Sequence, residues 1–269
     1  MVDKDNKKKS KIFITGDTHC PHDVNKLTSN FFEEGKELTK DDIVIICGDA
    51  GFVWDGSKEE QWIDWISEKP WTTIYCDGNH EGHVLLNTYP ITEFHGARVH
   101  KITDSLYHVL RGEVMNLNGK KFFFFGGGFS HDIEYRVENV SWWQEEIPVQ
   151  SEIDNAIDNL NKVNNKVDYI ITHDVPAKIN LMLGYNEQNM KVYDSKYVNL
   201  SSFLQNIYEM IEFKDWFAGH YHIDSKIDKV QILYQCIVKI NENISEKDKE
   251  KKEDYSFLNT PFYQFTFME

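Results

Sequence analysis

The chain has 269 residues, of which 41% are hydrophobic and 14% aromatic, a composition that supplies a buried core and excludes a disordered chain. Lys and Arg total 29 against 44 Asp and Glu, which gives a formal net charge of -15 at pH 7. A surface this acidic repels a phosphate backbone and argues against long nucleic acid as a partner. A small anionic substrate remains compatible with this charge, because bound cations invert the local field.

The lysine-rich start, MVDKDNKKKS, predicts a solvated, disordered leader over residues 1–10, followed by a single domain over 11–269. It has no apolar core of a signal peptide, and no apolar run reaches the ~18 residues that span a bilayer. The four cysteines lack CxxC spacing, so we expect reduced thiols in a cytoplasmic protein without a membrane partner. The sequence leaves a monomer and a modest homo-oligomer open.

Short runs of β-branched and aromatic residues predict the strands of the domain. Helical patterns lie between them. Ser57 and Glu60 are spaced as a capping box before Trp62, and Ser151 and Ser201 precede two further amphipathic runs. The alternation of strand and helix in the first half predicts βαβ units. The predicted strands are Lys11–Thr15, Asp42–Cys47, Thr72–Cys76, Lys121–Phe125, Val167–Thr172 and Val230–Ile240.

The middle of the chain, YHVLRGEVMNLNGKKFFFFGGG, is rich in strand formers, and Asn118-Gly119 predicts a tight hairpin turn within it. Near the C-terminus the charged stretch NENISEKDKEKKED predicts a solvated loop before a last apolar run, FYQFTF. We find no internal repeat and no linker rich in Pro, Gly or Ser, which favours one domain.

Polar residues of a few types follow the apolar runs, at the points where the predicted strands end. In open α/β sheets this edge is where ligands bind. Taken alone, each motif has a structural interpretation, such as a turn for GHYH or a core histidine for His173. The residues in chain order are Asp17 and His19, then Asp49, then Asn79, His80 and Glu81, then His173, and finally His220 and His222.

The chemistry of this set is coherent. Carboxylates, an amide oxygen and several imidazoles are ligands that suit borderline divalent ions such as Mn, Fe, Co or Zn. The set contains no cysteine, which argues against a structural zinc site. Asp49 stands centrally in the order and has two oxygens with which to bridge two ions.

The ordered motifs GDTHC, GDAG, GNHE, THDVP and GHYH resemble those of the calcineurin-like metallophosphoesterase superfamily. Cys20 stands where that superfamily usually has glycine. The resemblance implies an α/β fold, a four-layer α/β/β/α sandwich of two mixed sheets flanked by helices. It also implies two divalent ions, Mn being favoured over Fe, Zn and Co. One ion would be held by Asp17, His19, Asp49 and His222, and the other by Asp49, Asn79, His173 and His220.

The same resemblance implies hydrolysis of a phosphate ester by in-line attack of a hydroxide that bridges the two metals. His80 would protonate the leaving oxygen, with Asp55 as a candidate partner. An alternative is that His80 only hydrogen-bonds a metal ligand. We expect Glu81 to orient its loop without a catalytic role.

The substrate is constrained by what the motifs omit. The arginines that follow the second and third motifs in protein phosphatases are missing from GDAGFVWDG and GNHEGH, which argues against a phosphoprotein. We expect a small or nucleotide-like phosphorylated substrate, with Arg136 as a candidate phosphate contact. Trp142 and Trp143 either stack on a base or pack in the core, and core packing is favoured. A non-catalytic scaffold and a nuclease are the alternative functions.

Overall fold

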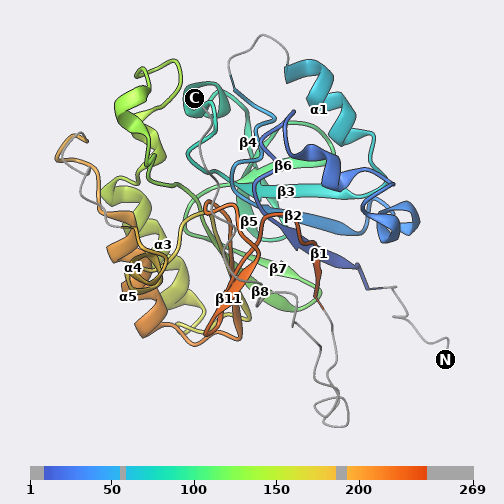
Figure 1. The fold of residues 1–269 in the computed structure, drawn as a ribbon. Coiled ribbons are helices and arrows are strands. Elements are labelled where there is room, and N and C mark those ends of the chain that lie inside the picture. Colours follow the sequence, from blue (N-terminus) through green and yellow to red (C-terminus); the bar gives the residue numbers. More distant parts are fainter. Residues whose placement is uncertain (1–8, 55–58, 186–192, 241–269) are drawn as a thin grey trace, which may run out of the picture.

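The computed structural model describes residues 9–54, 59–185 and 193–240, and these residues form two mixed β-sheets with helices on their outer faces (Figure 1). The predicted α/β class and the four-layer sandwich are confirmed. The layers follow from strands that are apolar on both faces, because each sheet then needs a second sheet on one side and helices on the other.

The first sheet contains seven of the described strands: β1 (Ile12–Thr15), β2 (Ile43–Cys47), β3 (Thr72–Cys76), β4 (Ile91–Phe94), β5 (Ala97–Lys101), β6 (Leu106–Val109) and β13 (Val238–Lys239). Their order is β13-β1-β2-β3-β6-β5-β4. β1, β2, β3 and β6 run parallel, and the other neighbours pair antiparallel. The carboxyl ends of β1, β2 and β3 therefore meet at one edge.

The second sheet contains six strands within the same described ranges: β7 (Glu113–Leu117), β8 (Lys120–Phe125), β9 (Tyr169–Thr172), β10 (Asp215–Ala218), β11 (Ser225–Ile227) and β12 (Val230–Ile232). Their order is β11-β12-β10-β9-β8-β7, with β12, β10, β9 and β8 parallel. The predicted hairpin joins β7 to β8. Asn118 and Gly119 have φ of 54° and 77°, the left-handed pair that a type I′ turn requires.

Helices cover the two outer faces. In Figure 1, α3 (Gln150–Lys162), α4 (Ala177–Met182) and α5 (Leu200–Met210) lie together on one side of the sandwich, and α1 (Glu59–Ser67) lies on the other. α2 (His83–Leu86) follows the loop after β3. Short 3-10 turns complete the described elements: η1 (Val24–Leu27), η2 (Glu33–Glu37), η3 (Ile133–Tyr135) and η4 (Gln144–Glu146).

Successive side chains of each central strand pack into different parts of the core. Ile45 of β2 and Phe124 of β8 pack in the cluster between the sheets. Their neighbours point the other way: Ile46 packs under α1 and the N-terminal turns, and Phe125 packs under α3 and α5. All four side chains are fully buried, so runs such as IVIIC and FFFF are continuous rather than alternating.

The prediction of one strand over Val230–Ile240 is wrong. The run forms β12 and β13, which belong to different sheets. Between them the Asp224 carboxylate accepts hydrogen bonds from the backbone N–H groups of Tyr234 and Cys236, at 2.8 and 3.0 Å. These two N–H groups are therefore not available to pair with a neighbouring strand, and the chain crosses from one sheet to the other at this point.

Two predicted helix starts are two residues late. α3 begins at Gln150 and α5 at Leu200, so Ser151 and Ser201 lie inside the helices. Asn199 caps α5 instead, because its side chain accepts a hydrogen bond from the backbone N–H of Ser202.

Some predicted features lie outside the described residues. The leader is described only from residue 9 onward. In this part Ser10 exchanges two hydrogen bonds with Asn118. Within the described ranges, no helix is long and apolar enough to cross a membrane. The features outside the described residues are 1–8 of the leader, Asp55, Ser57, the charged stretch and the last apolar run.

Candidate metal centre

The residues predicted to bind metal lie together at the edge where the parallel strands of both sheets end. Each stands in a loop directly after a strand, so strand direction and register decide their positions. The loop after β1 carries Asp17 and His19, those after β2 and β3 carry Asp49 and Asn79, and those after β9 and β10 carry His173, His220 and His222.

The backbone of these loops is unusual. Five of the seven residues have φ in the left-handed region: Asp17 (47°), His19 (33°), Asp49 (49°), His220 (73°) and His222 (51°). Such conformations are uncommon outside glycine, cost energy and gather at functional sites. The fold therefore holds these side chains in positions that a relaxed loop would not give them.

Glycines precede several of the predicted ligands, at positions where a side chain would not fit. A Cβ on Gly78 would lie 2.1 Å from Oδ1 of Asp49. A Cβ on Gly48, whose φ is 78°, would lie 2.4 Å from Nδ1 of His173. The Gly-Asp and Gly-Asn spacing of the motifs thus reflects close approach of the backbone to neighbouring ligands.

A first group surrounds His19. Its Nε2 lies 3.1 Å from Oδ2 of Asp49, 3.9 Å from Oδ1 of Asp17 and 3.3 Å from Nε2 of His222. Its other nitrogen, Nδ1, donates to the Asp23 carboxylate at 2.8 Å, which directs Nε2 toward the group. His222 is half exposed, so this side of the centre faces solvent.

A second group surrounds His173, which is fully buried. Its Nδ1 donates to the carbonyl of Cys47 at 2.9 Å, so in the neutral ring Nε2 carries a lone pair. That Nε2 lies 3.3 Å from Oδ1 of Asp49, 3.1 Å from Oδ1 of Asn79 and 3.1 Å from Nδ1 of His220.

This arrangement fits a cation. Nε2 of His173, Oδ1 of Asp49 and Oδ1 of Asn79 converge as three acceptors with no hydrogen between them. Either a proton or a metal ion must relieve the repulsion. Burial alone would lower the pKa of His173, but Asp49, Asp17 and the carbonyl of Cys47 together outweigh it and raise that pKa to about 10. The centre thus attracts positive charge, and its carboxylate, amide and imidazole donors suit Mn, Fe, Co or Zn.

Asp49 faces both groups. Oδ2 lies next to His19 and Oδ1 next to His173, as a bridging carboxylate requires. Asp17 is also fully buried, and burial, assisted by Asp49, raises its pKa to about 6. A divalent ion would offset this buried negative charge.

His80 and Arg136 lie beside the first group. His80 stacks near Trp54, and its Nε2 lies 2.8 Å from Nη2 of Arg136. The other two guanidinium nitrogens of Arg136 donate to Asp132 and to the carbonyl of Ser141, at 2.6 and 3.1 Å. A fixed cation therefore stands at the rim of the centre.

Comparison with known families shows which family the chain belongs to. Residues 10–224 match the model of the calcineurin-like phosphoesterase family. The chain belongs to the calcineurin-like phosphoesterase family. A comparison with curated proteins finds no match.

Membership of the phosphoesterase family agrees with the buried Asp and His groups, which are of the kind that holds divalent metal ions. Within the described part of the chain, three sets of Asp and His have ligand atoms within 4.8 Å of one another, and His80 belongs to one of them, which brings it within reach of a metal. The three sets are Asp17, His19 and His222; His19, Asp49 and His80; and Asp17, Asp49 and His173.

Glu81 ties two of these loops together. The residue is fully buried, and its Oε1 accepts a hydrogen bond from the backbone N–H of Ala50 at 2.7 Å. It therefore joins the loop after β3 to the loop after β2.

Sequence reasoning missed His131, whose Nε2 lies 3.1 Å from Nε2 of His220. His131 stacks on Tyr185, with ring centroids 4.5 Å apart. The signal was present in GGGFSHD, where a histidine again follows a strand. The three glycines put it further from the strand end than in the other motifs.

The two tryptophans of this segment pack in the interior, as favoured. Trp142 is buried against Phe129 and Tyr193. Trp143 is buried edge-on against Trp54, with ring centroids 4.9 Å apart. Trp143 thus supports the ring that lies next to His80.

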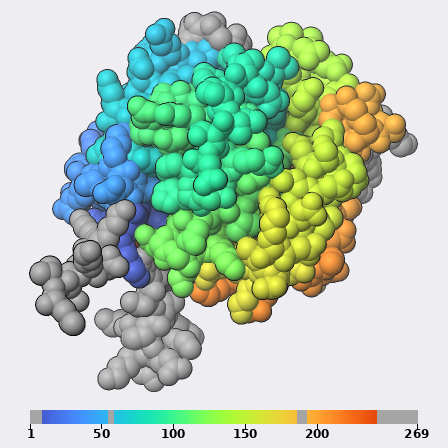
Figure 2. Space-filling model, turned by 180° about the vertical axis from the view of Figure 1, so that it is seen from behind, coloured from blue at the N-terminus to red at the C-terminus, as the bar shows by residue number. Residues whose placement is uncertain are grey.

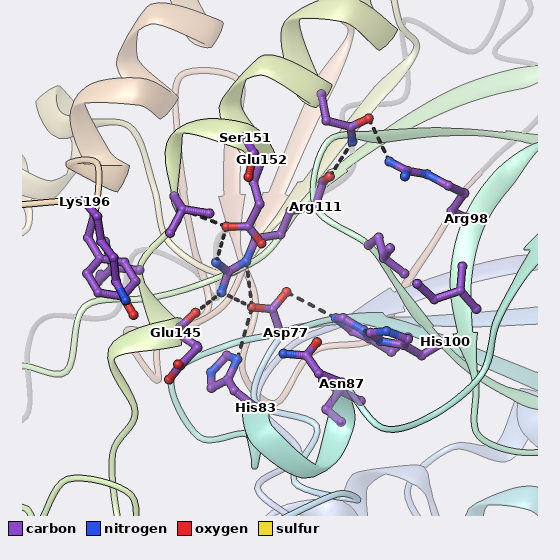
Figure 3. A pocket seen from close by; sticks show the side chains of 18 residues that line it. Asp77, His83, Asn87, Arg98, His100, Arg111, Glu145, Ser151, Glu152 and Lys196 are labelled. Carbon is purple, nitrogen blue, oxygen red and sulfur yellow. Dashed lines mark hydrogen bonds and ion pairs between the residues drawn. The ribbon is translucent and has the colours of Figure 1, made fainter. Parts of the chain in front are cut away.

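A cavity of about 660 Å³ lies behind the loop after β3 (Figure 3). Among the described residues, none of the predicted site residues lines it. Its wall includes the buried Arg111–Asp77 ion pair, His100 and residues of α3. Figure 2 shows the molecule from behind, where green residues of the middle of the chain lie next to the yellow-green residues that follow them.

Proposed function

We propose that the chain is a metal-dependent phosphoesterase that hydrolyses a phosphate monoester or diester of a small or nucleotide-like molecule. The observation that carries this proposal is the convergence of buried acceptor atoms on His173 and Asp49 with a fixed guanidinium, Arg136, close by. A centre that gathers cations next to a phosphate-binding side chain suits a phosphate ester.

We assign the ligands in two groups that share Asp49. Divalent ions in such a site acidify water and neutralise the charge of a phosphoryl group. The protein's part is to hold the ligand atoms in place, which it does through buried partners such as Cys47 for His173 and Asp23 for His19. The first group comprises Asp17, His19, Asp49 and His222, and the second comprises Asp49, Asn79, His173 and His220.

Arg136 and His80 would act on the substrate itself. The guanidinium of Arg136 is oriented by Asp132 and Ser141, and it can donate to a phosphoryl oxygen. His80 is fixed by its backbone N–H, which donates to Asp49 Oδ1 at 2.7 Å. We assign to His80 the transfer of a proton to the leaving oxygen.

The surface charge favours a small substrate over a long one. A net charge of -15 opposes the approach of a nucleic acid backbone, whereas a single phosphate group meets Arg136 at the rim. The charge therefore favours a small phosphorylated molecule over nucleic acid as the substrate.

The test is a hydrolysis assay with a chromogenic phosphodiester and the matching monoester, with and without Mn²⁺, after removal of metal by a chelator. We expect cleavage of at least one ester that depends on the added ion. Tight metal binding without cleavage of either ester, or of any member of a nucleotide panel, would contradict the proposal and favour a scaffold.

A further inference from the structure

A buried carboxylate, Glu146, lies two hydrogen bonds away from Asn79. Asn79 donates through Nδ2 to the Ser130 hydroxyl at 3.2 Å, and that hydroxyl donates to Oε2 of Glu146 at 2.8 Å. Ser130 and Glu146 are both fully buried, and neither belongs to the predicted metal ligands. The chain of bonds thus runs from a proposed ligand into the interior.

The Glu146 carboxylate determines which way the hydrogen bonds from Asn79 through Ser130 run. Oε1 of Glu146 also accepts from the backbone N–H of Ser130 at 3.1 Å and from the hydroxyl of Tyr193. An ionised carboxylate only accepts, so Ser130 must point its hydrogen at Glu146 and present a lone pair to Asn79. A lone pair binds the NH₂ end of an amide, not the oxygen end.

The hydrogen bond to Ser130 decides which end of the Asn79 amide faces the proposed metal site. The two ends of the Asn79 amide are nearly equal in size, so packing alone does not choose between them. With Nδ2 bonded to Ser130, Oδ1 must face Nε2 of His173, where it lies at 3.1 Å. The oxygen is a metal ligand and the NH₂ group is not.

Arg111 joins the loop that carries Asn79 to the turn that carries Glu146, and Figure 3 shows its contacts with Asp77 and Glu145. Its guanidinium is paired with Asp77, two residues before Asn79, and donates to the backbone carbonyls of Glu145 and Glu146, at 2.7 and 3.3 Å. The carbonyl of Asp77 in turn accepts from the backbone N–H of Gly127 at 2.9 Å. The loop that carries Asn79 and the turn that carries Glu146 are therefore joined through one buried cation.

We propose that Ser130 and Glu146 are positioning residues that orient the Asn79 amide with its oxygen toward the metal. They thereby set the affinity of the site that Asn79 shares with His173. This inference rests on the proposed function in one respect, because it takes Asn79 as a ligand. It adds a requirement for two residues that no metal ion would touch.

The experiment is calorimetric titration of the metal-free protein with Mn²⁺ at pH 8. Burial raises the pKa of Glu146 to about 7, so the carboxylate is mostly ionised at that pH. Ser130→Ala should weaken the binding of one of two ions by about 10- to 100-fold, the usual effect of losing such a partner. The other ion should bind as in the wild type.

Two further variants separate orientation from a general loss of structure. In Asn79→Asp both side-chain oxygens can bind metal, so adding Ser130→Ala to this variant should have little further effect on affinity. Ser105→Ala is the matched control. Ser105 is a buried serine that bonds Lys40 and Ser67, away from the metal centre. It should leave both affinities unchanged.

The outcomes decide between the two proposals. A wild-type protein that binds no divalent ion would overturn the proposed function. Wild-type binding of two ions, with the same two affinities in Ser130→Ala, would overturn this inference alone. An equal penalty in the Asn79→Asp background would also overturn it. Should Ser130→Ala not fold, Glu146→Gln takes its place, with the same selective loss expected and unchanged affinities counting against the inference.

Discussion

Nη2 of Arg136 and Nε2 of His80 lie 2.8 Å apart, in hydrogen-bonding contact. A guanidinium only donates, so Nε2 of His80 accepts and carries no hydrogen in this arrangement. Burial lowers the pKa of His80, and Arg136 acts in the same direction. For Nε2 of His80 to give a proton to a leaving group, the hydrogen bond from Nη2 of Arg136 must first break, and Nε2 must take up a proton from water; Nη2 then needs another acceptor. A phosphoryl oxygen is the acceptor that suits it.

His80→Ala should reduce turnover while leaving the metal content intact. General acid catalysis is worth about 10²- to 10⁴-fold, and we expect a loss in this range for an ester with an alkyl leaving group. The loss should be smaller for a nitrophenyl ester, because that oxygen leaves without a proton. The measurement is kcat for both esters, together with metal analysis of the variant.

The comparison also identifies the alternatives. An equal loss on both esters would assign His80 to phosphate binding or positioning. Depletion of metal from the variant would make His80 a ligand, which its place in a set with His19 and Asp49 would explain.

Arg136→Ala should raise KM and lower kcat/KM by about 10- to 100-fold, since a hydrogen bond to a charged group contributes about 1.5–3 kcal/mol. Arg98 provides the control, because it pairs with Glu113 on a strand away from the centre. Steady-state kinetics of both variants test this assignment. If Arg136→Ala had the same kinetics as Arg98→Ala, Arg136 would not contact the substrate.

The buried histidines His83 and His100 should become less stabilising as the pH falls below about 6.5. Burial lowers the pKa of both His83 and His100 to about 4, from an ordinary value of 6.5. The unfolded chain binds more protons between these values, so the stabilising effect is present at neutral pH and is lost through the window from 6.5 to 4. His83 should contribute about 2 kcal/mol of loss between pH 7 and pH 5, and His100 should contribute a smaller loss.

Urea unfolding of the wild type and a histidine variant at these two pH values, with chelator present, measures the histidine's contribution to the free energy of unfolding. His100→Gln should show a smaller difference between pH 7 and pH 5 than the wild type does. The same difference in both proteins would show that His100 titrates normally in the folded state.

All four cysteines are free thiols in the structure. Cys47 and Cys76 are fully buried in the core between the sheets, whereas Cys20 and Cys236 are partly exposed. A thiol reagent should therefore count four groups in the unfolded, unreduced protein and leave Cys47 and Cys76 unmodified in the folded one. Two or fewer groups after unfolding would reveal a disulfide and contradict the expected reducing environment.

The sequence was sufficient for five central strands, β1, β2, β3, β8 and β9, and for the edge at which the site lies, because both follow from local pattern. The apolar run before Asp49 is a strand whichever residues pack on it, and a parallel neighbour brings Asp17 to the same edge. Strand direction alone then gathers the ligands that the motifs name. The fold class could be predicted for the same reason.

The partners of these ligands could not be predicted, because they depend on contacts between distant segments. Ser130, in the loop after β8, contacts Asn79 in the loop after β3 and links it to Glu146. The break within Val230–Ile240 depends on Asp224, which takes backbone donors that the local pattern assigned to a strand. His131 and the contact of Arg136 with His80 arise from the same kind of long-range packing.

The central claim is that Asp49 bridges two metal ions, and the most direct measurement is the number of ions bound per chain. Elemental analysis of the wild-type protein, saturated with Mn²⁺ and freed of excess ion, should give two ions. Asp49→Asn should bind fewer, because a neutral amide is a poor bridge between cations. One ion per chain in the wild type, with the same number in Asp49→Asn, would contradict the account.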